Sequence, residues 1–178
     1  GEESVSGSVK MSPLKSDAQQ GRWIVDPLDG TTNYIHQFPM FCVSIGYEWQ
    51  GKIQLAVIDA PVLGEVYTAI RGQGAFVNGQ RMKVTSSAAL KDSFLGTGFF
   101  SGIEIHLAEQ FAIFSKLVRQ VRGVRFPGSA ALDLCQVARG VFDAYWNKDL
   151  KPWDAAAGML IIEEAGGKVL TYRGQPYD

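Results

Sequence analysis

The stretch Trp23-Ile24-Val25-Asp26-Pro27-Leu28-Asp29-Gly30-Thr31-Thr32-Asn33 decides how we interpret this chain. Its three leading apolar residues are typical of the end of a buried strand, which leads into a turn with two carboxylates three residues apart. Pro27 fixes its own φ and favours an extended conformation at Asp26, so the backbone between Asp26 and Asp29 is stiff. Gly30 permits a tight or left-handed turn, and the hydroxyl and amide side chains that follow it can cap a helix or close the turn.

This acidic turn has two interpretations. Two rigidly spaced carboxylates followed by backbone N–H groups suit a divalent cation that carries a phosphate. An ordinary polar turn at the end of a strand also produces Asp-Pro and Asp-Gly pairs, and for Asp-Pro-x-Asp-Gly alone the two interpretations weigh about equally. The longer stretch as a whole favours the cation site.

Composition and charge are those of an ordinary globular protein. The 178 residues, 46% hydrophobic and 20% charged, predict one domain or two tightly joined halves. A net charge of −1 gives no electrostatic argument for a nucleic acid or a membrane as partner. Cys42 and Cys135 lie in apolar contexts without metal-type spacing, which predicts buried thiols in a reduced, cytoplasmic protein. The start at Gly1, without an initiator methionine, predicts a fragment of a longer chain.

The first half of the chain predicts an antiparallel sheet. Turn signals such as Gln50-Gly51 and Asn78-Gly79 separate short β-type segments, and connections this short require antiparallel pairing. The predicted strands are residues 41–49, 52–59, 66–70, 75–77, 82–85 and 94–97.

The second half predicts alternating strands and helices. Apolar residues at helical spacing predict one amphipathic helix with its apolar stripe in the core: Ile103, Leu107, Phe111, Phe114 and Val118. The other predicted elements are strands at 124–126, 141–146 and 168–172, a helix from 128–129 to about 140, and a helix at 155–165. We therefore expect an α/β fold, a layered α+β sandwich, with an antiparallel half at 1–100 and a mixed half at 101–178.

Three more pieces of sequence have related chemistry but are weak evidence separately. Asp154, in Pro152-Trp153-Asp154-Ala155-Ala156-Ala157-Gly158, is typical of a helix N-cap. Glu2, in Gly1-Glu2-Glu3-Ser4, would ordinarily be a solvated acid. Gly128-Ser129-Ala130-Ala131 is typical of a helix N-terminus.

Taken in order, these motifs resemble those of the inositol monophosphatase family of metal-dependent, lithium-sensitive phosphatases. Residues 23–33 resemble the first family signature, and Trp153-Asp154-Ala155-Ala156-Ala157-Gly158 with Glu164-Ala165-Gly166-Gly167 resembles the second. Gly1-Glu2-Glu3-Ser4 is similar to the upstream acidic motif, and Pro127-Gly128-Ser129-Ala130-Ala131 to the start of the substrate helix. The resemblance covers nearly the whole chain. It implies part of the family fold, because family members begin several dozen residues earlier and continue further.

The resemblance implies a role for each matching residue. Two or three Mg²⁺ ions would be held by Glu2, Asp26, Asp29, Asp154 and the backbone carbonyl of Leu28. The phosphate would be received by the backbone N–H groups of Gly30 and Thr31. Catalysis would involve Glu2, Asp26 and the Thr31 hydroxyl, which would help to position the attacking water. The substrate would also contact Asp29, Asp154, Gly128, Ser129, Ala130 and Asn147.

Physical chemistry supports the metal independently of the resemblance. Four carboxylates converging in one cleft would repel one another, and some would stay protonated without a cation. A pair of ions ~3.5–4 Å apart can activate water and stabilise a departing alkoxide. No covalent nucleophile is then required, and Ser4, Ser44 and Ser129 lack a nearby histidine partner.

The substrate is less sharply defined than the reaction. Asn147 stands where family members that act on inositol phosphates often carry glutamate, and an amide lacks the charge-assisted strength of a carboxylate. Lys148 and Lys151 flank it and would suit a second phosphate, as in relatives that hydrolyse fructose 1,6-bisphosphate, but they also fit ordinary solvated lysines.

The leading hypothesis is a cytoplasmic, Mg²⁺-dependent phosphomonoesterase of the inositol-phosphate phosphatase type, acting on a small polyol or sugar phosphate. The alternatives are fructose 1,6-bisphosphatase activity, alone or in addition, and a non-catalytic scaffold that retains the fold. The resemblance also implies a homodimer.

Overall fold

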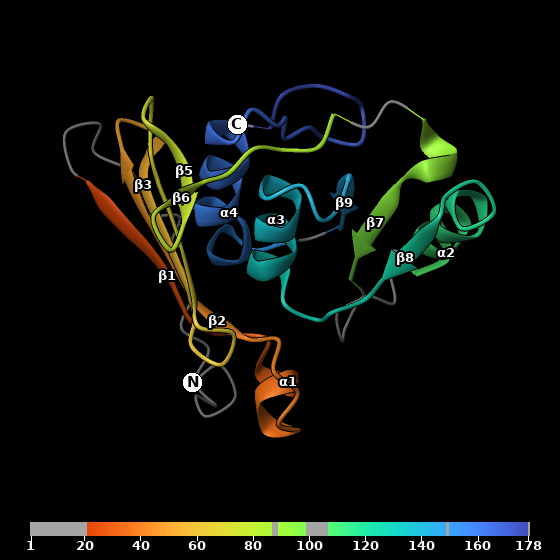
Figure 1. The fold of residues 1–178 in the computed structure, drawn as a ribbon, viewed down its shortest axis with the longest axis horizontal. Coiled ribbons are helices and arrows are strands. Elements are labelled where there is room, and N and C mark those ends of the chain that lie inside the picture. The colour runs from red at the N-terminus through yellow and green to blue at the C-terminus, as the bar shows by residue number, and fades with distance from the viewer. Residues whose placement is uncertain (1–20, 87–88, 99–106, 149, 178) are drawn as a thin grey trace.

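Two β-sheets and four α-helices make up the computed structural model, which describes residues 21–86, 89–98, 107–148 and 150–177 (Figure 1). The larger sheet is antiparallel and follows chain order: β1 (Arg22–Asp29), β2 (Cys42–Trp49), β3 (Lys52–Ala60), β4 (Glu65–Ile70), β5 (Gly74–Val77) and β6 (Gln80–Arg81). In the smaller sheet the central β7 (Phe94–Thr97) runs parallel to both β8 (Gly123–Arg125) and β9 (Ala144–Trp146). The predicted α/β fold, an antiparallel sheet followed by mixed strands and helices, is confirmed. Residues 94–97 were predicted among the antiparallel strands, but β7 is the central strand of the parallel sheet, so that assignment is wrong.

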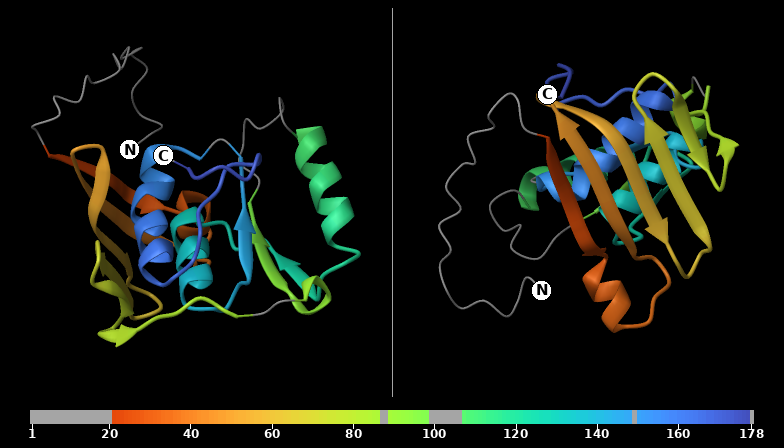
Figure 2. Two further views of the ribbon diagram at one scale, coloured as in Figure 1. Left: turned by 90° about the horizontal axis from the view of Figure 1, so that it is seen from above. Right: turned by 90° about the vertical axis from the view of Figure 1, so that its left-hand side faces the viewer.

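The helices separate the two sheets and extend the layering. Figures 1 and 2 show α3 (Ala130–Ala138) and α4 (Pro152–Glu164) between the large and the small sheet, with α2 (Leu107–Leu117) on the far side of the small sheet. The short helix α1 (Thr31–Ile35) follows β1 directly, and a 3₁₀ turn, η1 (Leu90–Asp92), precedes β7. None of the helices in the described part of the chain combines the length and apolar character needed to cross a bilayer.

The main core lies between the large sheet and the α3–α4 pair. Ile58 and Tyr67 from the sheet are fully buried there, as are Leu132 of α3 and Leu160 of α4. Gly158 lets the two helices approach closely, because a Cβ atom at this position would lie 2.5 Å from Leu134 Cδ1 and 2.7 Å from Leu134 Cβ. This packing holds the first turn of each helix against the end of β1.

The opposite face of the large sheet is apolar and exposed. The strand register places Trp23 beside Tyr47, and it places Ile45 between Val25 and Val57. Trp23 is 63% exposed, and the side chains of Val25 and Val57 are also exposed. In the right-hand view of Figure 2, no helix of the described residues lies over this face.

Three predicted strands differ from the observed elements. Residues 82–85 extend beyond β6 without joining the sheet, and residues 168–172 contribute only an isolated bridge, between Leu170 and Pro176. The strand predicted at 141–146 begins at Ala144, because the N–H groups of Val141 and Phe142 bond to the Gln136 carbonyl and close the end of α3. The remaining predicted strands lie within one residue of the observed bounds or overlap them closely.

The helix predicted around 103–118 is present as α2, but its buried face is not the predicted one. Phe111 is 49% and Val118 42% exposed, so the predicted assignment of both to the core is wrong. Gln110 is the fully buried residue of this helix, and Ile103 lies outside the described residues. Hydrophobic spacing identified the helix, whereas its packing against the rest of the fold selected the inward face.

The close contact of α3 and α4 gives the first prediction. Gly158→Ala should lower the free energy of unfolding by about 1–3 kcal/mol, because overpacking of a tight core costs more than the better helix propensity of alanine returns. Urea unfolding would measure the change. Gly123→Ala in β8 is the matched control, since a Cβ there would meet its neighbours at 3.5 Å or more. Equal stability of both variants would contradict the tight-contact argument.

Candidate metal centre

An extra residue in β1 brings Asp26 and Asp29 to the same face of the sheet. On a regular strand, residues three apart point to opposite faces. Asp26 pairs with Ser44 and Asp29 pairs with Cys42, so three steps along β1 correspond to two along β2. This is a β-bulge, and the N–H of Leu28 within it donates to Asp26 Oδ1 at 3.0 Å. The bulge turns both carboxylates towards α3 and α4.

Asp154 reaches the same place from the first turn of α4. The helix begins at Pro152 with Lys151 as its N-cap, so the prediction of Asp154 as N-cap is wrong. The physical reason is that proline suits the first helical position, so Pro152 begins the helix and the cap lies three residues before Asp154, at Lys151. The Asp154 carboxylate instead accepts the N–H of Lys151 at Oδ2, at 2.7 Å. The hydroxyl of Ser44 donates to the Trp153 carbonyl at 3.4 Å and ties this turn to β2.

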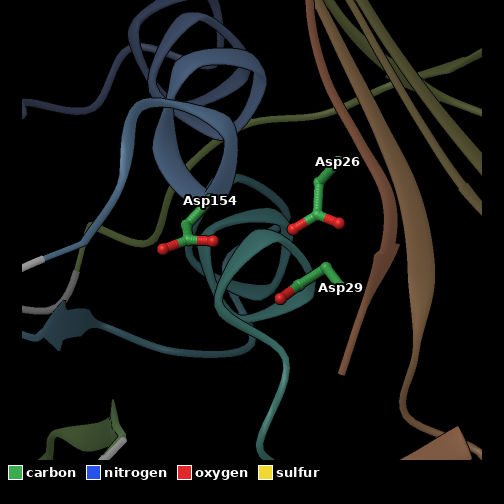
Figure 3. A group of neighbouring side chains, drawn as sticks. All are labelled: Asp26, Asp29 and Asp154. Atoms are coloured by element: carbon green, nitrogen blue, oxygen red, sulfur yellow. The ribbon is translucent and has the colours of Figure 1, made fainter. Parts of the chain in front are cut away.

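The side chains of Asp26, Asp29 and Asp154 converge (Figure 3). Each offers a carboxylate oxygen, and these oxygens all lie within 4.8 Å of one another. Three hard oxygen donors at this separation are the kind of ligand set that Mg²⁺ and Ca²⁺ prefer. The donor chemistry and the mutual distances therefore fit a divalent cation, and the three acids form a candidate metal-binding cluster.

Asp29 is the most buried member of the cluster, with 6% of its surface exposed. Its Oδ2 accepts hydrogen bonds from the Ser129 hydroxyl at 2.5 Å and from the Ala131 N–H at 2.8 Å. Burial raises the pKa of Asp29 to about 6; these two bonds oppose the shift, and the charges of Asp26 and Asp154 add to it. A bound cation would favour the ionised carboxylate.

The turn after β1 has the backbone geometry that the sequence predicted. Gly30 adopts φ 85°, and a Cβ atom there would lie 2.7 Å from the Met40 carbonyl oxygen, so glycine is required. The Thr31 hydroxyl donates to the Leu28 carbonyl at 3.0 Å. Thr31 thus lies directly beside the carbonyl that was predicted as a metal ligand.

Asn33 links this turn to the start of α3. Its Nδ2 donates to the Met40 carbonyl at 2.7 Å and to the Pro127 carbonyl at 2.8 Å. Sequence reasoning recognised Asn33 as a turn-closing residue, but nothing in the local pattern indicates the bond to Pro127, 94 positions away in the chain.

The predicted substrate residues have different environments. Gly128 adopts φ 87° and precedes Ser129, the N-cap of α3; Ser129 and Ala130 are each 1% exposed. Asn147 is held within the chain, because its Nδ2 donates to the Tyr145 hydroxyl at 2.6 Å and its Oδ1 accepts the Lys148 N–H at 2.7 Å.

Lys148 and Glu2 are the two remaining residues to which the sequence analysis gave a possible role in the site. The ammonium of Lys148 pairs with the Glu109 carboxylate of α2, so it is engaged by an acid of the same chain. Glu2, the upstream metal ligand implied by the family resemblance, lies outside the described residues.

Asp133 of α3 is a buried acid that sequence reasoning did not single out. Only 1% of it is exposed, and its Oδ1 has no hydrogen-bond partner. Burial, followed by the charge of Asp29, raises the pKa of Asp133 to about 8. An acid within a helix is usually solvated, so the residue type alone gives no signal of such burial.

Comparison with known proteins agrees with this geometry. The model of the inositol monophosphatase family matches residues 1–178. The inositol-1-monophosphatase of Rhizobium meliloti is 47% identical over 146 residues, which cover 82% of this chain and 55% of the relative. The Nus factor SuhB of Pseudomonas aeruginosa is 46% identical over 154 residues, 85% and 57% of the two chains. This chain thus spans less than two thirds of the length of these relatives.

Solved structures show the same relationship. The structure of inositol monophosphatase from Anabaena (Nostoc) sp. PCC 7120 superposes with a TM-score of 0.87 at 43% identity and covers 93% of this chain and 66% of that one. Both sheets and the helices between them therefore follow an established architecture. On the matches of sequence and fold together, this chain belongs to the inositol monophosphatase family.

Proposed function

We propose that this chain carries the metal site of a Mg²⁺-dependent phosphomonoesterase, an inositol-phosphate phosphatase in type, that hydrolyses a small polyol or sugar phosphate. The convergence of the Asp26, Asp29 and Asp154 carboxylates within 4.8 Å is the observation that carries the proposal. Three acids this close are electrostatically unfavourable without a cation, which gives their arrangement a physical reason.

Each acid of the cluster has a stated task in this proposal. Asp26, Asp29 and Asp154 hold two or three Mg²⁺ ions, with the Leu28 carbonyl and Glu2 as further ligands. Bound Mg²⁺ ions supply an activated water and neutralise the charge of the phosphate.

Thr31 and Gly30 position the reacting groups. The Thr31 hydroxyl donates its hydrogen bond to the Leu28 carbonyl at 3.0 Å, so its oxygen lone pairs can accept a hydrogen bond from a water molecule and orient it. The left-handed Gly30 begins a helix, whose first N–H groups have no intrahelical partner and can receive phosphate oxygens.

The environment of Asn147 and Lys148 favours a monophosphate with hydroxyl groups over a bisphosphate. Lys148 is paired with Glu109, and a second phosphate would have to compete with that carboxylate. The alternative of fructose 1,6-bisphosphatase activity is nevertheless supported by a relative in Aquifex aeolicus named fructose-1,6-bisphosphatase/inositol-1-monophosphatase, 41% identical over 156 residues. A non-catalytic scaffold is the third candidate, and it offers no physical reason for keeping three converging acids.

The setting of the reaction is part of the same proposal. We infer that the protein is a cytoplasmic homodimer. It binds a small phosphorylated substrate, and it binds neither a nucleic acid nor a membrane. Cys42 and Cys135 are buried and form no disulfide, which supports a reducing compartment. The homodimer rests on the family resemblance.

Loss of one cluster acid tests the function. Asp154→Asn should reduce Mg²⁺-dependent phosphate release by more than about 100-fold, because an amide cannot supply the ligand charge. Phosphate release would be followed with inositol 1-phosphate and fructose 1,6-bisphosphate over a Mg²⁺ titration. Asp59→Asn, which changes an exposed aspartate of β3, is the matched control and should behave like the parent. A parental kcat for Asp154→Asn would exclude the proposed ligand set, and no turnover of either substrate by the parent would favour the scaffold.

Metal affinity should depend on pH through Asp29. The pKa of this carboxyl is raised to about 6, so it is ionised above that pH and protonated below it, and only the ionised form binds a cation. The Mg²⁺ dissociation constant should therefore stay level between pH 7 and 8 and rise by up to about tenfold per pH unit below about pH 6. Isothermal titration calorimetry at several pH values would measure it. A level profile down to pH 5 would show that Asp29 is not a ligand.

A further inference from the structure

The hydrogen bonds around Asp29 distinguish its two carboxylate oxygens. Oδ2 is occupied by the Ser129 hydroxyl at 2.5 Å, the Ala131 N–H at 2.8 Å and, more weakly, the Cys42 thiol at 3.8 Å. This leaves Oδ1 as the oxygen that can serve a cation.

Ser129 is itself held in one orientation. It is 1% exposed, and it is the N-cap of α3, with its Oγ accepting the Leu132 N–H at 3.4 Å. A hydroxyl that accepts from Leu132 directs its single proton elsewhere, and Asp29 Oδ2 is the acceptor in line for it. The backbone before it is fixed as well, because Asn33 bonds to the Pro127 carbonyl and approaches the left-handed Gly128 closely.

We propose that Ser129 is a positioning residue for the metal ligand Asp29, and that it acts through this carboxylate without contacting the substrate. The proposal rests on the proposed metal site. Its hydroxyl is buried and already uses its one proton and one of its acceptor sites inside the protein, so it has little left to offer an alcohol group. Without the hydroxyl, Asp29 Oδ2 keeps only the Ala131 N–H and the weaker Cys42 thiol as donors, so the orientation of the carboxylate at the cation is less restrained.

The proposal predicts which property a Ser129 variant loses, metal affinity or substrate binding. A positioning residue that orients a ligand changes metal affinity, typically by about 10- to 100-fold when it is removed. A residue that contacts the substrate changes KM for the substrate at saturating metal. Ser129 belongs to the first kind in this proposal.

Three variants of Ser129 separate these defects. Ser129→Ala removes the hydroxyl, Ser129→Thr keeps it, and Ser129→Gly removes it at a cap position where glycine is well tolerated. If the Ser129→Ala variant folds poorly, Ser129→Gly still allows the effect of losing the hydroxyl to be measured. Ser93→Ala is the matched control, because the Ser93 hydroxyl is also buried but bonds to the Ala89 carbonyl, away from the cluster.

Mn²⁺ binding, followed by electron paramagnetic resonance, is the readout that does not depend on activity. Circular dichroism would confirm that each variant is folded. Ser129→Ala and Ser129→Gly should weaken Mn²⁺ binding by about 10- to 100-fold, and Ser129→Thr and Ser93→Ala should bind within about threefold of the parent. With saturating Mg²⁺, the KM for inositol 1-phosphate should be unchanged in all folded variants.

Unchanged Mn²⁺ affinity in folded Ser129→Ala or Ser129→Gly would overturn the positioning role, and so would a raised substrate KM with normal Mn²⁺ affinity. Failure of the parent to bind Mn²⁺ would remove the metal site and the positioning role together. Mn²⁺ binding by the parent without phosphatase activity would refute the proposed function alone, and the comparison of the variants would still decide the role of Ser129.

Discussion

The candidate metal site requires the carboxylates of Asp26, Asp29 and Asp154 to lie close together although their charges repel one another. A regular β1 would point Asp26 and Asp29 to opposite faces of the sheet, one towards the core and one towards solvent. The single extra residue between them changes this, and the short helix that follows can begin only because Gly30 accepts a left-handed conformation. Asp154 then closes the cluster from the end of a different element.

The rest of the fold restrains this unfavourable arrangement. The α3–α4 pair packs on the inner face of the large sheet, so the N-terminal turns of both helices meet the end of β1. The N-terminus of α3 binds Asp29 through Ser129 and Ala131, while Lys151 holds Asp154 at the start of α4. Favourable hydrogen bonds on the protein side of two acids thus offset part of the cost of burying them.

Burial also changes the pKa values of the acids in and beside the site. Asp29 is protonated more readily than an ordinary aspartate, and the neighbouring Asp133 still more so, because burial opposes their charged forms. A divalent cation at this candidate cluster would reverse that preference, and its binding would then be coupled to proton release. Membership of the inositol monophosphatase family fits a site of this kind, and the relatives named SuhB or fructose-1,6-bisphosphatase show that the family name alone does not determine the substrate.

The local sequence was sufficient for most of the secondary structure. Turn signals between β-type segments located the antiparallel strands, and helical spacing and helix-end residues located the three longer helices, because these signals depend on neighbours within a few residues. Errors occurred where distant contacts decide: residues 82–85 do not continue β6, residues 168–172 form only an isolated bridge, and α2 buries Gln110 in place of Phe111. The cap of α4 was misplaced by the ambiguity between a capping aspartate and one in the first turn.

For the candidate site, the sequence by itself determined which residues are chemically suited: the paired acids of the turn, the obligatory glycine after them, and the aspartate in the first turn of the last helix. Motif order supplied their grouping through a family resemblance. Only the tertiary structure decided that Asp26, Asp29 and Asp154 meet, that Ser129 bonds to a carboxylate, and that Asn147 and Lys148 are occupied by Tyr145 and Glu109. The physical reason is that a strand bulge and the packing of two helices set these distances, and neither is encoded by spacing along the chain.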